Sequence, residues 1–167
     1  GTLTIDAEYG HGIVTKDNLV IASGVYDITA ESHGISGKDS VTITGGTFDI
    51  TCGEDGIHGS NDEDDTLGWV TITGGTITIA AGDDGVHAET ALTVSGGTID
   101  ITESYEGLEG KSVTIEGGVI TIESSDDGLN AAGGDGSAGW GSFTSDDSCY
   151  IEISGGELYI NADGDGI

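Results

Sequence analysis

Short stretches of alternating apolar and polar residues recur along the whole chain. Val41–Ile43 and Phe48–Ile50 are two of them, and the glycine pair Gly45-Gly46 lies between them. Alternation with a period of two marks a half-buried strand, and glycine supplies the positive φ that a tight turn needs. The second stretch is followed by a polar turn, a glycine and one branched apolar residue, as in Asp55-Gly56-Ile57. The pattern therefore predicts three short strands in each repeat.

The glycine of the polar turn sets the period of the repeat. These glycines are Gly12, Gly34, Gly56, Gly85, Gly107, Gly128 and Gly166. Their spacings of 22, 22, 29, 22, 21 and 38 residues give a period near 22, with insertions at about residues 60–68 and 131–149. This period favours a single all-β domain over residues 1–167, a right-handed parallel β-helix (β-solenoid) of about seven rungs. Leucine-rich repeats overlap this period, but their sequence motif is absent.

Stacking the repeats on one another aligns the apolar residues in three columns. The first is Leu3, Tyr26, Phe48, Ile77, Ile99, Ile120 and Leu158. The second is Ile5, Ile28, Ile50, Ile79, Ile101, Ile122 and Ile160, and the third is Leu19, Val41, Val70, Leu92, Val113 and Ile151. We expect all three columns to point inward and to form the core.

Both ends of the sequence match parts of a repeat. Thr2–Ile5 matches a second strand, Asp165–Ile167 matches a third, and the chain contains no methionine. We therefore expect it to be a fragment of a longer solenoid. Because the open ends of a β-helix expose sheet edges, end-to-end self-association is the alternative explanation.

The charge of the chain excludes several classes of partner. It has 31 acidic residues, three lysines and no arginine, for a net charge of −28. Nucleic acids and anionic membranes attract proteins through Lys and Arg, so neither is an expected partner. No apolar run approaches the length that spans a membrane. A chain this acidic is expected to stay solvated or to recruit cations.

The acidic residues of the polar turns are candidate metal ligands. They are Glu54, Asp55, Asp83, Asp84, Glu106, Asp126, Asp127, Asp163 and Asp165. Equivalent side chains of neighbouring repeats lie about 4.8 Å apart, where two carboxylates repel each other by about 3 kcal/mol at an effective dielectric constant near 20. Ca²⁺ binds oxygen at about 2.3–2.6 Å and fits between them. We expect more than one Ca²⁺ ion; the alternative is a solvated acidic edge that deters aggregation.

Other polar residues leave alternatives open. His58 and His87 occupy equivalent positions of neighbouring repeats, and a surface ladder is favoured over a zinc pair because no thiolate or third histidine is in register. Lys111 is a turn charge or a contact for an anionic ligand. The Asn61–Asp65 insertion closes over an ion or is a solvated loop. Trp140 stacks on a sugar ring or covers the flank of the β-helix.

The two cysteines are not expected to pair. Cys52 and Cys149 lie four repeats apart. At about 4.8 Å per repeat, this distance exceeds the roughly 7 Å that a disulfide spans between Cα atoms.

Four motifs carry a resemblance to a known family. They are Ser104–Ser112, Ser125–Gly134, Ile151–Gly156 and Asn161–Gly166. With them the whole chain resembles a family of secreted carbohydrate-binding β-helix proteins from clostridia and their relatives. The resemblance implies a pectate-lyase-like fold, calcium, binding to cellulose and polygalacturonate without established cleavage, and an extracellular or cell-surface location.

The acidic-turn motif of that family maps onto particular turns of this chain. The matching positions are Asp83-Asp84, Asp126-Asp127 and the pair Asp163 and Asp165. His11 and His33 depart from the acidic pattern, which argues against calcium in the first two repeats. Tyr105 belongs to one of the four motifs and joins Trp140, Lys111, His58 and His87 as a candidate carbohydrate contact.

Three functions follow in order of preference. The first is a non-catalytic, calcium-dependent module that binds an acidic plant polysaccharide such as polygalacturonate, or cellulose. The second is a structural, end-stacked fibre or adhesin segment. The third is a weak calcium-dependent lyase, which is disfavoured because pectate-lyase-like enzymes use an arginine base and this chain has none. Lys111, beside Glu109, or a histidine is then the remaining base.

Overall fold

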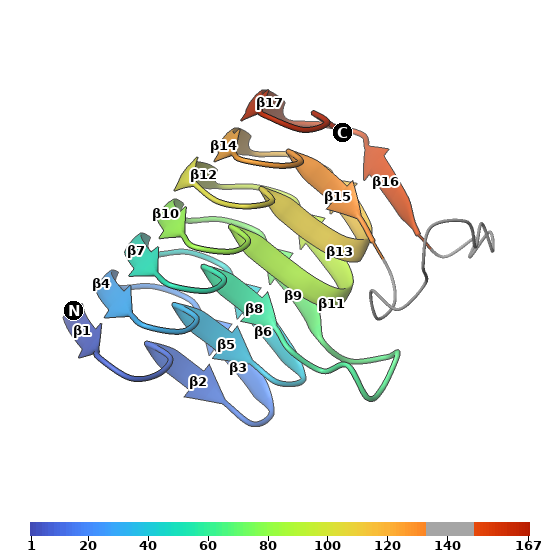
Figure 1. Ribbon diagram of the computed structural model, residues 1–167. Coiled ribbons are helices and arrows are strands. Elements are labelled where there is room, and N and C mark those ends of the chain that lie inside the picture. Colours follow the sequence, from blue (N-terminus) through green and yellow to red (C-terminus); the bar gives the residue numbers. More distant parts are fainter. Residues whose placement is uncertain (133–148) are drawn as a thin grey trace.

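Parallel strands account for all the regular structure of the described chain. The computed structural model (Figure 1) describes residues 1–132 and 149–167, and within them it contains strands and turns but no helix. No segment of the described chain is therefore a helix long and apolar enough to cross a membrane. Trp140 and most of the second insertion lie outside the described residues.

One sheet contains seven strands in the order of the repeats. The strands are β1 (Thr2–Ala7), β4 (Val25–Ala30), β7 (Thr47–Cys52), β10 (Thr76–Ala81), β12 (Thr98–Glu103), β14 (Val119–Ser124) and β17 (Glu157–Ala162). Each strand pairs in parallel with its equivalent in the neighbouring repeat. Successive repeats therefore lie on top of one another along this sheet (Figure 1).

The second sheet consists of two parallel rows. One row has β2 (Ile13–Thr15), β5 (Ile35–Gly37), β8 (Ile57–Gly59), β11 (Val86–Val94), β13 (Leu108–Ile115) and β15 (Leu129–Ala131). The other has β3 (Asn18–Ile21), β6 (Ser40–Ile43), β9 (Trp69–Ile72), the second halves of β11 and β13, and β16 (Tyr150–Ile153). Thus β11 and β13 each replace two of the three predicted strands by one longer strand.

The three predicted apolar columns lie in the core, which also contains the apolar residues after the turn glycines, such as Ile57, and those at the ends of the β3 row, such as Ile43. Every neighbouring pair within each column is in register, for example Tyr26 with Phe48 and Ile79 with Ile101. The members in the middle repeats are buried, whereas Leu3 in the first repeat is 47% exposed. Each buried branched side chain stabilises the fold by about 1.5–3 kcal/mol. In each glycine pair of the described chain the second glycine has a positive φ, such as 121° at Gly46, as the tight turn requires.

Both cysteines are free, as predicted, and their environments differ. Cys52 is buried in β7, and burial raises the pKa of its thiol to about 11, whereas Cys149 is half-buried. Because the thiolate is the reactive form, iodoacetamide at pH 8 is expected to alkylate Cys52 about 100-fold more slowly in the folded chain than in urea. Peptide mass spectrometry measures both thiols in one sample, with Cys149 as the internal control. Equal rates for Cys52 in both states would contradict its packing.

Candidate functional site

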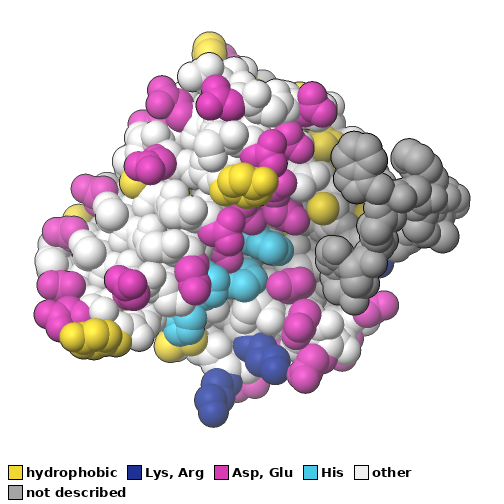
Figure 2. Space-filling model, in the orientation of Figure 1, with side chains coloured by type: hydrophobic (Ala, Val, Ile, Leu, Met, Phe, Trp, Pro, Cys, Tyr) yellow, Lys and Arg dark blue, Asp and Glu magenta, His cyan; other side chains and the backbone are white. Residues whose placement is uncertain are grey.

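A column of polar side chains runs along the stack at the polar turn. This turn column contains His11, His33, Asp55, Asp84, Glu106, Asp127 and Asp165, each directly before a turn glycine. Backbone hydrogen bonds hold its repeats in register: Gly56 donates to the carbonyl of Asp84 at 2.9 Å, and Gly85 donates to that of Glu106 at 2.9 Å. In Figure 2 the histidines form a continuous row that leads into a patch of carboxylates.

One oxygen of several turn-column aspartates binds the backbone of the next repeat. Asp55 Oδ1 accepts the amide of Asp84 at 3.1 Å, Asp84 Oδ1 accepts that of Glu106 at 3.2 Å, and Asp127 Oδ1 accepts that of Asp165 at 2.7 Å. Asp55 and Asp84 are each 3% exposed, so they are not part of a solvated acidic edge. Their Oδ2 atoms remain available for side chains or an ion.

A second column faces the turn column. This strand column contains Ser36, His58, His87, Glu109 and Asn130, which are in register in β5, β8, β11, β13 and β15. Each of these residues lies three positions after the turn-column residue of the same repeat. The two columns therefore bring pairs such as Asp84 with His87, and Glu106 with Glu109, to one side of the stack.

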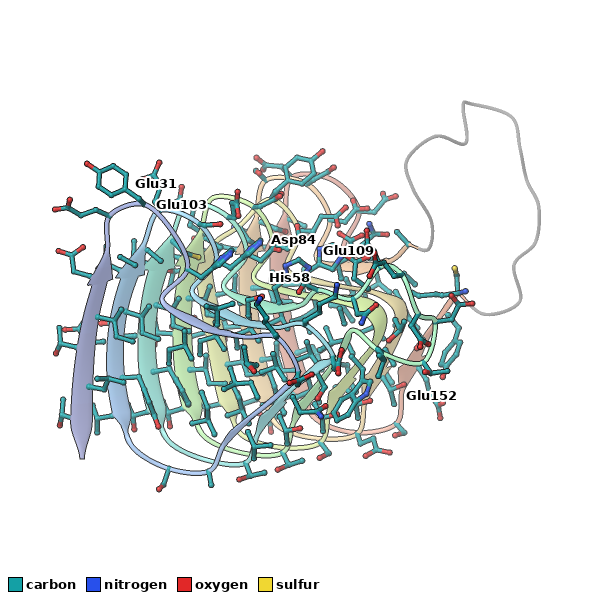
Figure 3. All side chains as sticks on the ribbon, turned by 90° about the horizontal axis from the view of Figure 1, so that it is seen from below. Glu31, His58, Asp84, Glu103, Glu109 and Glu152 are labelled. Carbon is teal, nitrogen blue, oxygen red and sulfur yellow. The ribbon has the colours of Figure 1, made fainter. Side chains whose placement is uncertain are left out.

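Three carboxylates converge where the two columns meet. Asp84, Glu106 and Glu109 each offer an oxygen, and these oxygens lie within 4.8 Å of one another. Asn130 Nδ2 donates to Glu106 Oε1 at 2.6 Å and fixes that side chain. Burial, and then the hydrogen bonds with Glu106 and Asp84, raise the pKa of Glu109 to about 10. Without a cation, this carboxylate triad therefore retains a proton at neutral pH. Figure 3 shows Asp84 and Glu109 beside His58.

The four histidines form a connected row toward the N-terminal repeats. The ring centroids of His11 and His33 are 5.0 Å apart, those of His33 and His58 are 4.5 Å apart, and those of His58 and His87 are 4.9 Å apart. His58 and His87 are neighbours in register as predicted, with rings tilted by 41°, and their side chains are half-buried, 12% and 24% exposed. A third histidine does join them: His33 approaches from the turn column rather than from the strand column.

Burial and neighbouring charges shift the pKa values of His58, His87 and Asp55 in opposite directions. Burial lowers the pKa of His58 to about 4, against the opposite effect of Asp55, so His58 is neutral at pH 7. Burial would also lower the pKa of His87, but its hydrogen bond to Asp84 and the charge of Asp55 raise it. For Asp55, burial opposes ionisation, but the hydrogen bond with His33 and the charges of His58 and His87 lower its pKa.

The predicted metal ligands are not all brought together. Asp55, Asp84 and Glu106 are buried, and exposed Glu54 lies 3.2 Å from His33 Nε2. These four belong to clusters of close metal-ligand atoms among the described residues. The other five predicted ligands join no such cluster: they are exposed Asp83, Asp163 and Asp165, and half-buried Asp126 and Asp127.

Sequence reasoning missed Glu89 and Glu109 as ligands. Glu109 completes the carboxylate triad, and Glu89 Oε1 lies 3.5 Å from His58 Nε2 and 4.0 Å from His87 Nε2. A signal was present for Glu109, since the residue three positions after the turn-column residue is polar in several consecutive repeats. No comparable repeat signal marks Glu89.

The candidate carbohydrate contacts among the described residues differ in exposure and surroundings. Tyr105 is 49% exposed, and its hydrogen bond to Asp126 raises its pKa. Lys111 lines a cleft of about 390 Å³, and the other lining residues are Asn61, Asp62, Asp64, Asp65, Glu89 and Thr90. His58 and His87 leave little surface for a sugar ring.

The first insertion closes through hydrogen bonds of its own. Asn61 is buried, and its Oδ1 accepts the amides of Glu63 and Asp64, each at 3.1 Å. The Asn61 side chain therefore holds the backbone of this loop together. Lys38 Nζ also forms an ion pair with Glu63 Oε2 of this loop at 3.1 Å.

Comparison with known proteins gives one match. The family model described as "carbohydrate-binding domain-containing protein" matches residues 1–166. Neither the curated proteins nor the solved structures give a significant match.

Proposed function

Since the chain belongs to the family of carbohydrate-binding domain-containing proteins, we propose that it is a non-catalytic module that binds a polysaccharide through calcium. The ligand would be an acidic plant polysaccharide such as polygalacturonate, with cellulose as the neutral alternative. The observation that carries this proposal is the carboxylate triad of Asp84, Glu106 and Glu109.

The carboxylate triad has the chemistry of a calcium site. Ca²⁺ takes oxygen ligands at about 2.3–2.6 Å, so two oxygens on one ion are separated by up to about 5 Å. The oxygens of the carboxylate triad, within 4.8 Å of one another, fit this limit. A divalent cation would also replace the proton that burial, and then the neighbouring Glu106 and Asp84, keep on Glu109.

Charge then explains how an acidic protein could hold an acidic polymer. A net charge of −28 repels polygalacturonate. Ca²⁺ accepts 6–8 oxygen ligands, more than three monodentate carboxylates provide. The remaining positions are open to uronate carboxylates and water. Tyr105 and Lys111, which flank Glu106 and Glu109 in the sequence, are the side chains we assign to sugar contacts.

The proposal also includes the type of β-fold and the location of the protein. The parallel register of every repeat supports a right-handed β-helix of about seven rungs, with the turn column along one corner. The module would act outside the cell or at the cell surface, where plant polysaccharides occur.

Binding to a panel of polysaccharides tests this function. With Ca²⁺ present, the chain is expected to co-sediment with calcium-crosslinked polygalacturonate or with cellulose, and to release no unsaturated product that absorbs in the ultraviolet. Binding to neither polymer would contradict the polysaccharide module. Product release that disappears in the variant Lys111→Met would instead show a uronate lyase.

A further inference from the structure

Two histidines aim the same ring nitrogen at one carboxylate, outside the carboxylate triad. His58 Nε2 lies 3.5 Å from Glu89 Oε1, and His87 Nε2 lies 4.0 Å from the same oxygen. Donor atoms around a tetrahedral Zn²⁺ with bonds of about 2.0–2.1 Å are roughly 3.4 Å apart. The three donors lie within 4.8 Å of one another, so inward shifts on the order of 1 Å would bring them to one ion.

The other nitrogen of each ring is held by a buried carboxylate. His58 Nδ1 lies 3.3 Å from Asp55 Oδ2, and His87 Nδ1 lies 3.1 Å from Asp84 Oδ2. Metal-binding histidines usually donate their second N–H to a carboxylate in this way, which orients the ring and exposes the lone pair of Nε2.

The Nε2 atom of His58 lacks a hydrogen-bond partner. It is the one buried side-chain nitrogen or oxygen without a hydrogen bond among residues 1–132 and 149–167. Buried polar atoms without a partner are rare because each is costly in free energy. A metal ion at this position would satisfy it.

From these contacts we propose that His58, His87 and Glu89 form a second metal site, for a first-row divalent transition metal with Zn²⁺ as the best match. Two imidazoles and one carboxylate favour Zn²⁺ over Ca²⁺, which prefers oxygen ligands alone. The Glu89 side chain is 31% exposed and lines the 390 Å³ cleft, so the ion has a route from solvent. A fourth ligand, water or an oxygen of a bound molecule, would enter from that cleft.

This site is separate from the proposed calcium site, although Asp84 contacts both. Asp84 Oδ2 orients His87 of its own repeat. The other two members of the carboxylate triad, Glu106 and Glu109, belong to the following repeat. The inference therefore does not depend on polysaccharide binding, and either site can fail without the other.

Cobalt spectroscopy on the full chain tests the site. After treatment with chelator, the chain is titrated with Co²⁺ in a large excess of Ca²⁺. We expect one equivalent to produce visible absorption bands of four- or five-coordinate Co²⁺, and one equivalent of Zn²⁺ to abolish them. If no such bands appear in excess Ca²⁺, the proposal is overturned, because calcium would then have occupied an all-oxygen site.

Variants locate the binding site. His87→Gln is expected to weaken Co²⁺ and Zn²⁺ binding about 100-fold, and Glu89→Gln about 10-fold. The matched control His11→Gln removes a histidine that is exposed and lies outside the proposed site, and should bind like the parent chain. Unchanged affinity in both His87→Gln and Glu89→Gln, or loss in His11→Gln alone, would overturn the assignment. Partly exposed Glu89 provides a variant that does not disturb the core.

Discussion

Replacing Glu109 with Gln is expected to stabilise the calcium-free protein and to weaken calcium binding at the same time. The pKa of Glu109 is raised to about 10 in the folded chain but returns to about 4.3 on unfolding. Between these values the unfolded chain has released a proton that the folded chain keeps, so stability falls as the pH rises. The amide introduced by Glu109→Gln does not titrate in this range, so the substitution removes this loss.

The partial exposure of Glu109 limits the stabilisation expected from Glu109→Gln. Glu109 is half-buried, so solvent screens part of the repulsion from Asp84 and Glu106. We expect a gain of about 2 kcal/mol at pH 8 in chelator, which for a chain of this length raises the melting temperature by about 4–8 °C. Calcium affinity should fall about 10-fold or more, because one charged ligand is lost.

Thermal melts in chelator and in Ca²⁺ measure both effects. Glu152→Gln is the control: it makes the same charge change at an exposed position of β16, away from the carboxylate triad (Figure 3). The control should melt like the parent chain under both conditions. A destabilised Glu109→Gln protein in chelator would contradict the electrostatic account of the carboxylate triad.

Replacing Gly56 with Ala is expected to destabilise the protein by about 3 kcal/mol or more. A Cβ atom at this position would lie 2.5 Å from the carbonyl oxygen of Gly85 and 2.5 Å from Ile79 Cγ2. Neither can withdraw, because Gly85 is tied into the backbone ladder and Ile79 is fully buried. Overpacking of this kind typically costs about 1–3 kcal/mol, and more where backbone is involved.

Urea denaturation measures this cost against a matched substitution. Gly10→Ala is the control, because no atom lies within 4 Å of a Cβ built there. It should change the free energy of unfolding by less than about 0.5 kcal/mol. Equal stability of the two variants would mean that the repeats do not approach each other closely at the turn glycines.

The apolar columns were predictable from the sequence because two periods determine them. Alternation places Ile77 and Ile79 on the same face, and the 22-residue repeat aligns them with Ile99 and Ile101. The first insertion does not disturb this alignment, because its seven extra residues lie in the loop between β8 and β9 and outside the strands. The fusion of two predicted strands in β11 and β13 was not predictable. The connection Glu89–Ala91 is as polar as the turns elsewhere.

The meeting of the two polar columns was harder to anticipate. Asp84 and His87 are three residues apart, and a continuous strand would place them on opposite faces. The turn at Gly85 reverses this relation and brings their side chains to 3.1 Å. Glu89 reaches the histidines of two repeats only because β8 and β11 are in register. Such contacts depend on turn geometry, which the residue types alone do not specify.

Affinity electrophoresis in polygalacturonate tests the central claim most directly. The chain is run in native gels with and without the polymer, once in Ca²⁺ and once in chelator. We predict retardation by the polymer in Ca²⁺ alone, with less retardation of Glu109→Gln than of Glu152→Gln. Equal retardation in chelator would contradict a calcium bridge between the carboxylate triad and the polysaccharide.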